Sequence, residues 1–107
     1  SDFPVVEWGT NQVIGVLGEN DLLRALQGQD DRVPIREVMR KDIPTINDDE
    51  PVYLALEQML KSGLKAVPVV DGQGSLVGLL TTSDVNEAFR FFSLEQKLIK
   101  SREKMTN

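Results

Sequence analysis

The chain has 107 residues, enough for one domain with a modest hydrophobic core. Its net charge of −5 argues against general nucleic-acid binding, because that function needs a basic face to neutralise phosphates. The sequence contains no cysteine and no histidine, which excludes disulfides, Cys/His zinc sites and catalysis with histidine as a base. No run approaches the ~18 apolar residues of a membrane span, and Ser1 and Asp2 lead into a strand-like segment rather than a signal peptide. We therefore expect a soluble segment in the cytoplasm, with no direct membrane insertion.

The first third of the sequence predicts a hairpin followed by a helix. Apolar runs at residues 3–6 and 13–17 flank a glycine-containing turn, which is typical of a β-hairpin. An amphipathic helix is expected to start near Asp21 and to stop at Gly28. A polar linker, 29–32, and a short helical turn within 33–39 complete this part.

The remaining sequence predicts two further strand and helix pairs. Residues 43–46 are expected to form a short edge strand, because Pro44 cannot donate a hydrogen bond to a neighbouring strand. Cap residues and Pro51 then begin a helix that runs to Ser62 and ends at Gly63. Strands at 66–70 and 76–80 flank a turn at 71–74, and a last helix runs from Ser83 towards Arg102.

One sequence frame occurs twice. Phe3-Pro4-Val5-Val6, Gly15 and Asp21 return about 63 residues later as Val67-Pro68-Val69-Val70, Gly78 and Asp84. Two copies of one supersecondary unit are expected to pack on each other, since neither can bury its apolar face alone. The second copy has the order β-α-β-β-α, whereas the first retains only β-β-α. We expect a partial first repeat at 1–32, a complete second repeat at 33–92 and a helical extension at 93–107.

This order and these residues resemble the CBS domain, which is named after cystathionine β-synthase and usually occurs as a tandem pair. The resemblance covers about residues 3–90 and rests on these segments: Val38-Met39, Ile43-Pro44-Thr45-Ile46, Pro51, Gly63, Val67-Pro68-Val69-Val70-Asp71 and Leu76-Val77-Gly78-Leu79-Leu80-Thr81-Thr82-Ser83-Asp84-Val85. It implies an α+β fold in which two small sheets pack around a pseudo-twofold axis with short helices outside. It also implies a regulatory module that binds AMP, ADP, ATP or S-adenosylmethionine between the repeats and associates as a homodimer.

In this family, the stretch from Gly78 to Asp84 looks like the element that holds ribose and phosphate. The Asp84 carboxylate suits a ribose diol, the Thr81 hydroxyl can donate or accept, and a helix start favours phosphate. The spacing of Thr81 and Asp84 equally predicts a helix-capping box. Both interpretations stay open at this point.

Further site residues follow from the same resemblance. Ala66, Val67 and Pro68 match the wall that holds adenine, while Ile43 and Thr45 match the first-strand positions of the cleft. Lys65 is placed to reach a phosphate. Ile43 and Val67 equally suit the core, and Lys65 equally suits a solvated surface.

The first copy departs from the pattern. Gly18 stands where the second copy has Thr81, so that the hydroxyl is missing, whereas Pro4 and Asp21 are retained. The strand and helix that normally complete the site are also missing. Pro4 and Asp21 therefore predict a weaker second site.

The leading functional hypothesis is a ligand sensor that modulates an effector domain outside this chain. The alternative is a structural dimerisation module without a ligand, in either case as part of a larger protein such as a membrane metalloprotease or transporter. An enzyme is not expected, because no nucleophile and base pair stands out, and no metal or required cofactor is predicted. The apolar series between Phe89 and Ile99 is expected either to cover the incomplete first repeat or to contact a second subunit.

Overall fold

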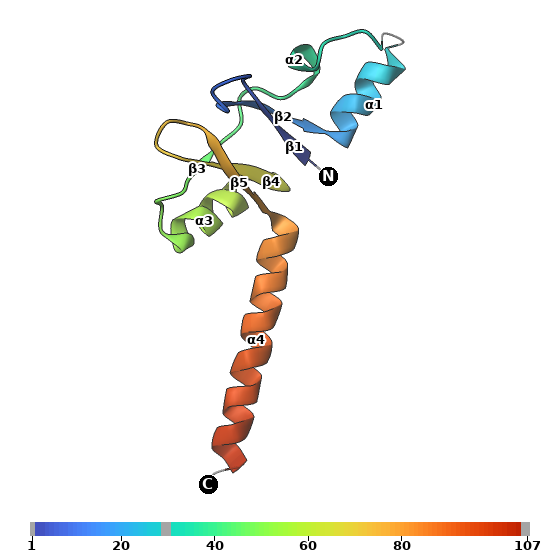
Figure 1. The fold of residues 1–107 in the computed structure, drawn as a ribbon. Helices are drawn as coiled ribbons and strands as arrows, with labels where there is room; N and C mark the ends of the chain where they lie inside the picture. The colour runs from blue at the N-terminus through green and yellow to red at the C-terminus, as the bar shows by residue number, and fades with distance from the viewer. Residues whose placement is uncertain (1, 29–30, 106–107) are drawn as a thin grey trace.

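A two-stranded and a three-stranded sheet organise the chain, whose computed structural model describes residues 2–28 and 31–105 (Figure 1). The polar linker expected at 29–32 begins at two residues that lie outside the described ones. The elements in chain order are β1 Asp2–Val6, β2 Val13–Gly18, α1 Glu19–Gln27, α2 Ile35–Val38, β3 Ile46–Asn47, α3 Val52–Ser62, β4 Ala66–Val70, β5 Leu76–Thr81 and α4 Thr82–Met105.

The first repeat is a hairpin with a helix, as the sequence predicts. Strands β1 and β2 pair antiparallel, with Pro4 opposite Val16 and an irregularity between Val5 and Val6. Helix α1 follows β2 directly and ends at Gly28. Val16 is 2% exposed, so β2 supplies the interior of this repeat.

The second repeat contains the larger sheet, in the order β3-β4-β5. Strands β4 and β5 form the predicted antiparallel hairpin, whereas β3 runs parallel to β4. A parallel pair needs a crossover connection, which α3 supplies. Ile46, Met59 and Val67 are buried together between the sheet and α3. Gly63 ends α3 in the left-handed conformation at φ 66°, as predicted from its position.

The strand expected at residues 43–46 is largely wrong, because β3 comprises only Ile46–Asn47. Ile43, Pro44 and Thr45 form irregular backbone that leads into it. Pairing begins where Ile46 becomes buried opposite Val69, and the N–H of Asp48 extends it by donating to the carbonyl of Val70 at 2.8 Å. Pro44 lacks an N–H, which explains why the ladder does not reach further back.

The two repeats meet through their hairpin turns. The N–H of Leu76 donates to the carbonyl of Asn11 at 2.9 Å, and the Asn11 side-chain amide donates to the carbonyl of Leu76 at 3.0 Å. The N–H of Val13 likewise donates to the carbonyl of Gly74 at 3.2 Å. These bonds join the two sheets, mostly through backbone atoms.

Helix α4 projects away from both sheets (Figure 1). It continues without a break through the extension predicted at 93–107 as far as Met105, the last described residue. It is much longer than the short outer helices that the resemblance implies, and it does not cover the first repeat. Among the described residues, the helices lack the combination of length and apolar character that crossing a membrane requires.

Candidate functional site

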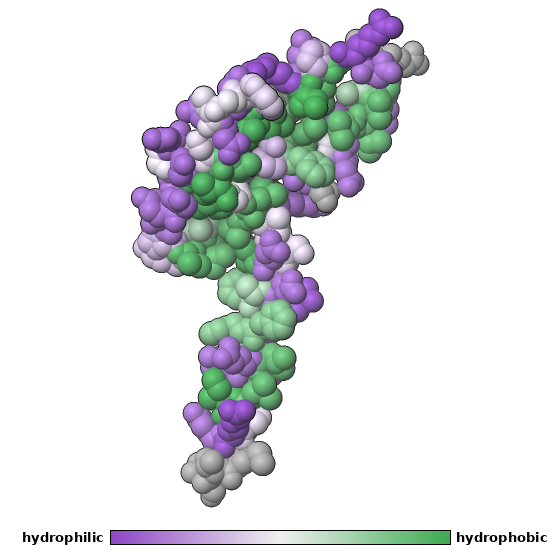
Figure 2. All heavy atoms as spheres, in the orientation of Figure 1, coloured by the Kyte–Doolittle hydropathy of each residue, from purple (hydrophilic) through white to green (hydrophobic). Residues whose placement is uncertain are grey.

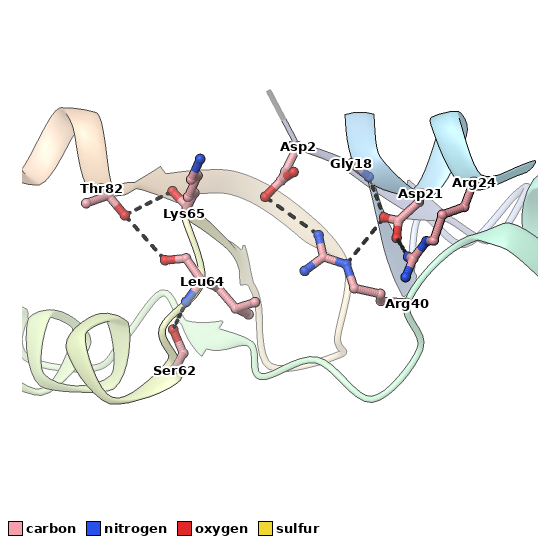
Figure 3. Close-up of polar contacts among 9 residues, drawn as sticks. All are labelled: Asp2, Gly18, Asp21, Arg24, Arg40, Ser62, Leu64, Lys65 and Thr82. Carbon is pink, nitrogen blue, oxygen red and sulfur yellow. Dashed lines mark hydrogen bonds and ion pairs between the residues drawn. The ribbon is translucent and has the colours of Figure 1, made fainter. Parts of the chain in front are cut away.

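The start of α4 is fixed to the segment that leads into β4 (Figure 3). The N–H of Thr82 donates to the carbonyl of Lys65 at 2.8 Å. The Thr82 hydroxyl lies 3.2 Å from the same carbonyl and 3.3 Å from that of Leu64. These bonds bring the predicted residues Lys65 and Thr81 to one region. Thr82 was not among the predicted site residues, although the adjacent hydroxyls of Thr81, Thr82 and Ser83 were a signal.

Thr81 caps α4, while Asp84 leaves its carboxylate in solvent. The N–H of Asp84 donates to the Thr81 hydroxyl at 3.1 Å, which realises one half of the expected capping box. The Asp84 side chain is exposed, and it makes no hydrogen bond or ion pair within residues 2–28 and 31–105. The Thr81 hydroxyl can still donate. Capping and ligand binding are therefore compatible.

The residues matched to an adenine wall belong to the core. Ala66, Val67 and Pro68 are buried in β4, and Val67 packs against Ile46 and Met59. Ala66 pairs with Thr81 across the sheet. Packing thus accounts for the Val67 side chain, and any contact from this strand to a ligand would come from backbone atoms.

A cavity of about 430 Å³ lies beside this region. It is lined by residues 40–44 together with Ser62 and Leu64. Its volume falls in the range of about 300 to 1,000 Å³ that small-molecule sites occupy. Ile43 is half-buried in its wall, whereas Thr45 is exposed just beyond the lining segment. Leu64 lines the cavity, and its carbonyl accepts a hydrogen bond from the Thr82 hydroxyl.

Ser62 shapes the rim of this cavity through its hydroxyl. The hydroxyl donates to the carbonyl of Met59 at 2.8 Å and accepts from the N–H of Leu64 at 3.1 Å. Both bonds hold the turn after α3 against Leu64. Ser62 therefore positions the cavity wall, and its hydrogen-bonding capacity is already largely used.

Asp21, the counterpart of Asp84 in the first repeat, has the opposite environment. It is 3% exposed and accepts a hydrogen bond from the N–H of Gly18 at 2.8 Å. Arg24 forms a close ion pair with it, and Arg40 Nε lies 3.4 Å from its carboxylate (Figure 3). Burial raises the pKa of Asp21, but the Gly18 bond and the charges of Arg40 and Arg24 outweigh it and lower that pKa overall.

Arg40 belongs to the second repeat, contacts the first, and was not among the predicted site residues. Its N–H and carbonyl pair with those of Val16 at 2.9 and 3.0 Å, while its side chain also lies 3.6 Å from Asp2. A buried carboxylate needs a cationic partner, but the burial of Asp21 was not predicted, so no signal for Arg40 was present in the sequence. Pro4 is half-buried within β1 opposite Val16, which is a structural position.

Comparison with known sequences identifies the family. Residues 35–90 match the family model described as the CBS domain, and the chain belongs to this family. An uncharacterised 17.7 kDa protein of Acidianus ambivalens is 31% identical over 78 residues, which are 73% of this chain and 48% of that protein. The chain spans about a quarter to a half of the length of the first curated relatives that it matches.

Solved CBS domain proteins share the fold. The CBS domain pair of protein MJ0100, in complex with 5-methylthioadenosine and S-adenosyl-L-methionine, matches with a TM-score of 0.69 and 30% identity, covering 82% of this chain and 71% of that one. The CBS domain protein PAE2072 of Pyrobaculum aerophilum, complexed with AMP, matches with a TM-score of 0.66 and 29% identity, covering 78% and 64%. The resemblance and the α+β fold are confirmed.

Metal binding finds no support in the described ranges. Within residues 2–28 and 31–105, acidic side chains do not gather into a group of three or more that would hold a metal ion. The candidate site for an organic ligand consists of Asp84, Thr81, Lys65 and the cavity lined by Leu64.

Proposed function

We propose that this chain is the regulatory module of a larger protein and that it binds an adenosine derivative next to the start of α4. One observation carries the proposal: the second repeat leaves Asp84 exposed and unpaired among the described residues. It lies two residues after Thr82, whose hydroxyl bonds to Leu64 in the wall of a cavity of ligand size. MJ0100 and PAE2072 were solved with adenosine compounds, which supports this class of ligand.

Each residue of the site has a distinct proposed role. Asp84 accepts hydrogen bonds from the ribose diol, and Lys65 with the N-terminus of α4 faces phosphate. Ile43 and Thr45 border the base, and the backbone of Ala66, Val67 and Pro68 contacts its edge. Pro4 and Asp21 form at most a weaker second site, because Asp21 is already paired with Arg24 and Arg40.

Regulation follows if the ligand favours one arrangement of the repeats. A ligand shifts an equilibrium only when it binds two arrangements with different affinity. The repeats are joined at their turns, and α4 is tied to the site through Thr82. We propose that α4 passes the change to an effector outside this chain, and that any catalysis belongs there. In this proposal, the partial repeat at 1–32 and the complete one at 33–92 are the sensor, and residues 93–107 are the connecting extension.

Calorimetry with AMP, ADP, ATP and S-adenosylmethionine tests ligand binding. We expect at least one dissociation constant below about 1 mM, which corresponds to roughly 4 kcal/mol. Asp84→Ala should weaken binding by about tenfold or more, because charged hydrogen bonds contribute roughly 1.5–3 kcal/mol. Glu87→Ala, which removes an exposed acid one turn further along α4, is the matched control. If none of the four ligands binds below that limit, the sensor hypothesis is wrong.

A structural association module is the second candidate, and the surface of α4 supports it. Phe91, Leu94 and Leu98 are 55–64% exposed, and apolar colour runs along the projecting helix in Figure 2. Residues 89–107 also carry five basic and two acidic residues, whereas residues 1–88 carry seven and fifteen. A homodimer in which α4 meets the acidic body of a second copy uses both features. Dimerisation without nucleotide binding would favour this candidate.

A further inference from the structure

We infer that Arg40 recognises the anionic group of the ligand and makes the site selective for phosphate-bearing adenosines over neutral ones. The inference rests on the proposed function, since it concerns the same cavity. It adds to the site a residue of the second repeat whose backbone and side chain both contact the first repeat. It also assigns that residue two partners, namely the ligand and the first repeat.

The backbone of Arg40 is held in place, so that only its side chain is free to reorient. Its N–H and carbonyl both pair with Val16. Residues 39 and 40 also pack tightly on β2: a Cβ atom at Gly15 would lie 2.6 Å from Met39 Sδ and 2.8 Å from the Arg40 carbonyl oxygen. The Cα atom of Arg40 is therefore held at a fixed position on the cavity wall.

The guanidinium has unused hydrogen-bonding capacity. Its distances of 3.4 Å to Asp21 and 3.6 Å to Asp2 exceed the roughly 2.7–2.9 Å of a charge-assisted hydrogen bond. Its Nε atom is buried and faces Asp21, so a ligand would use the terminal nitrogens of the guanidinium. A guanidinium offers five donors in a planar fork, which matches a phosphate. The two long ion pairs hold the side chain without using up its donors.

The cavity has the polarity that a nucleotide requires. Arg40 and Lys41 give it two cationic residues against the single acid Asp42, although the whole chain has a net charge of −5. Ile43 and Leu64 supply apolar surface for a base. An anionic group drawn to Arg40 competes with Asp21 for the guanidinium, which links occupancy of the cavity to the first repeat.

The test compares AMP with adenosine, because the two differ only by the phosphate. We expect wild-type protein to bind AMP at least about tenfold more tightly than adenosine, given the strength of charged hydrogen bonds. Arg40→Gln should lower this ratio at least about threefold, by weakening AMP while leaving adenosine binding unchanged; Lys65 and the start of α4 keep the rest of the preference. Arg36→Gln is the matched control, since Arg36 is an exposed arginine that pairs with Glu7 and does not line the cavity.

A second variant guards against misfolding. Arg40→Gln leaves the buried Asp21 carboxylate with one cationic partner fewer, so the double variant Asp21→Asn with Arg40→Gln removes both charges together. An unchanged ratio in both variants overturns the inference and leaves the proposed function intact. A wild-type protein that binds AMP and adenosine equally also overturns it. If wild-type protein binds neither compound, the inference fails together with the proposed AMP site.

Discussion

Asp21 and Asp84 occupy the same place in the two repeats but have different energetic roles. Asp21 satisfies the Gly18 N–H and faces Arg40, and it is buried, whereas Asp84 is exposed. Removing a buried acceptor leaves its donors unsatisfied, and this costs more than removing an exposed one. The first aspartate therefore serves stability, and the second is free to bind a ligand.

We predict that Asp21→Ala lowers the free energy of unfolding by about 2–4 kcal/mol, since a buried donor and a partly buried arginine lose their partner. Asp84→Ala should change it by no more than about 0.5 kcal/mol, as is usual for an exposed side chain. Urea denaturation followed by circular dichroism measures both. Equal losses in the two variants would contradict the different roles assigned to these residues.

At the same scale, local sequence order predicted which residues lie around the start of α4, and their roles in ligand binding stay predictions. Lys65, Thr81 and Asp84 follow from local order, because the strand and helix that carry them are adjacent in the chain. Arg40 was not predicted, since its contact with Asp21 forms only when the segment around Arg40 folds back onto β2. The burial of Asp21 was not predicted for the same reason, because it depends on a contact between distant segments.

Gly15 and Gly78 occupy the same place in the two repeats, but Gly15 is closely surrounded and Gly78 is not. At Gly15, an added Cβ would lie 2.8 Å from the Arg40 carbonyl oxygen, whereas at Gly78 the nearest atom would be Val69 Cβ at 3.8 Å. Gly15 is needed because Met39 and Arg40 cross β2 there. Gly78 has no such close neighbour among the described residues.

We therefore predict that Gly15→Ala destabilises the protein by about 1–3 kcal/mol, the usual cost of overpacking. Gly78→Ala, the matched substitution, should have an effect within about 0.5 kcal/mol, because its new methyl group makes only an ordinary contact. Thermal unfolding monitored by circular dichroism tests the pair. If Gly78→Ala lost more stability than Gly15→Ala, the close contact of Gly15 with Met39 and Arg40 would not explain the need for glycine there.

Among the elements, the hairpins and α3 were predictable, because each carries its own turn or cap signals. The strand β3 was predicted too early in the chain, at 43–46 in place of Ile46–Asn47, since the apolar run does not reveal where pairing with β4 starts. Sheet register is a property of two strands, and the pattern of one strand does not determine its ends.

The whole molecule is elongated because of α4. Its radius of gyration is 18.7 Å and its longest extent is 69 Å, against about 13 Å expected for the radius of a compact chain of this length. Exposed apolar residues along a projecting helix are a cost that association relieves. The shape thus supports a homodimer, which the sequence also predicts.

We predict that sedimentation equilibrium shows a dimer. Leu94→Ser with Leu98→Ser should weaken the dimer by about tenfold or more, because burying each leucine side chain on association contributes roughly 1.5–3 kcal/mol. Gln96→Ser is the control for a change in the same helix. If wild-type protein sediments as a monomer with a scattering radius near 18.7 Å, α4 does not mediate self-association.

The attachment of α4 to the site has a mechanical consequence. The helix has 24 residues and starts at Thr82, whose bonds to Leu64 and Lys65 set the direction of its first turn. At about 1.5 Å per residue, it is a lever arm of roughly 36 Å. A rotation of about 5° at the base moves the far end by about 3 Å, the size of a hydrogen bond. If the proposed ligand turns the base of α4 by this amount, a shift too small to alter the sheets becomes a displacement of a few ångströms at the far end of the helix.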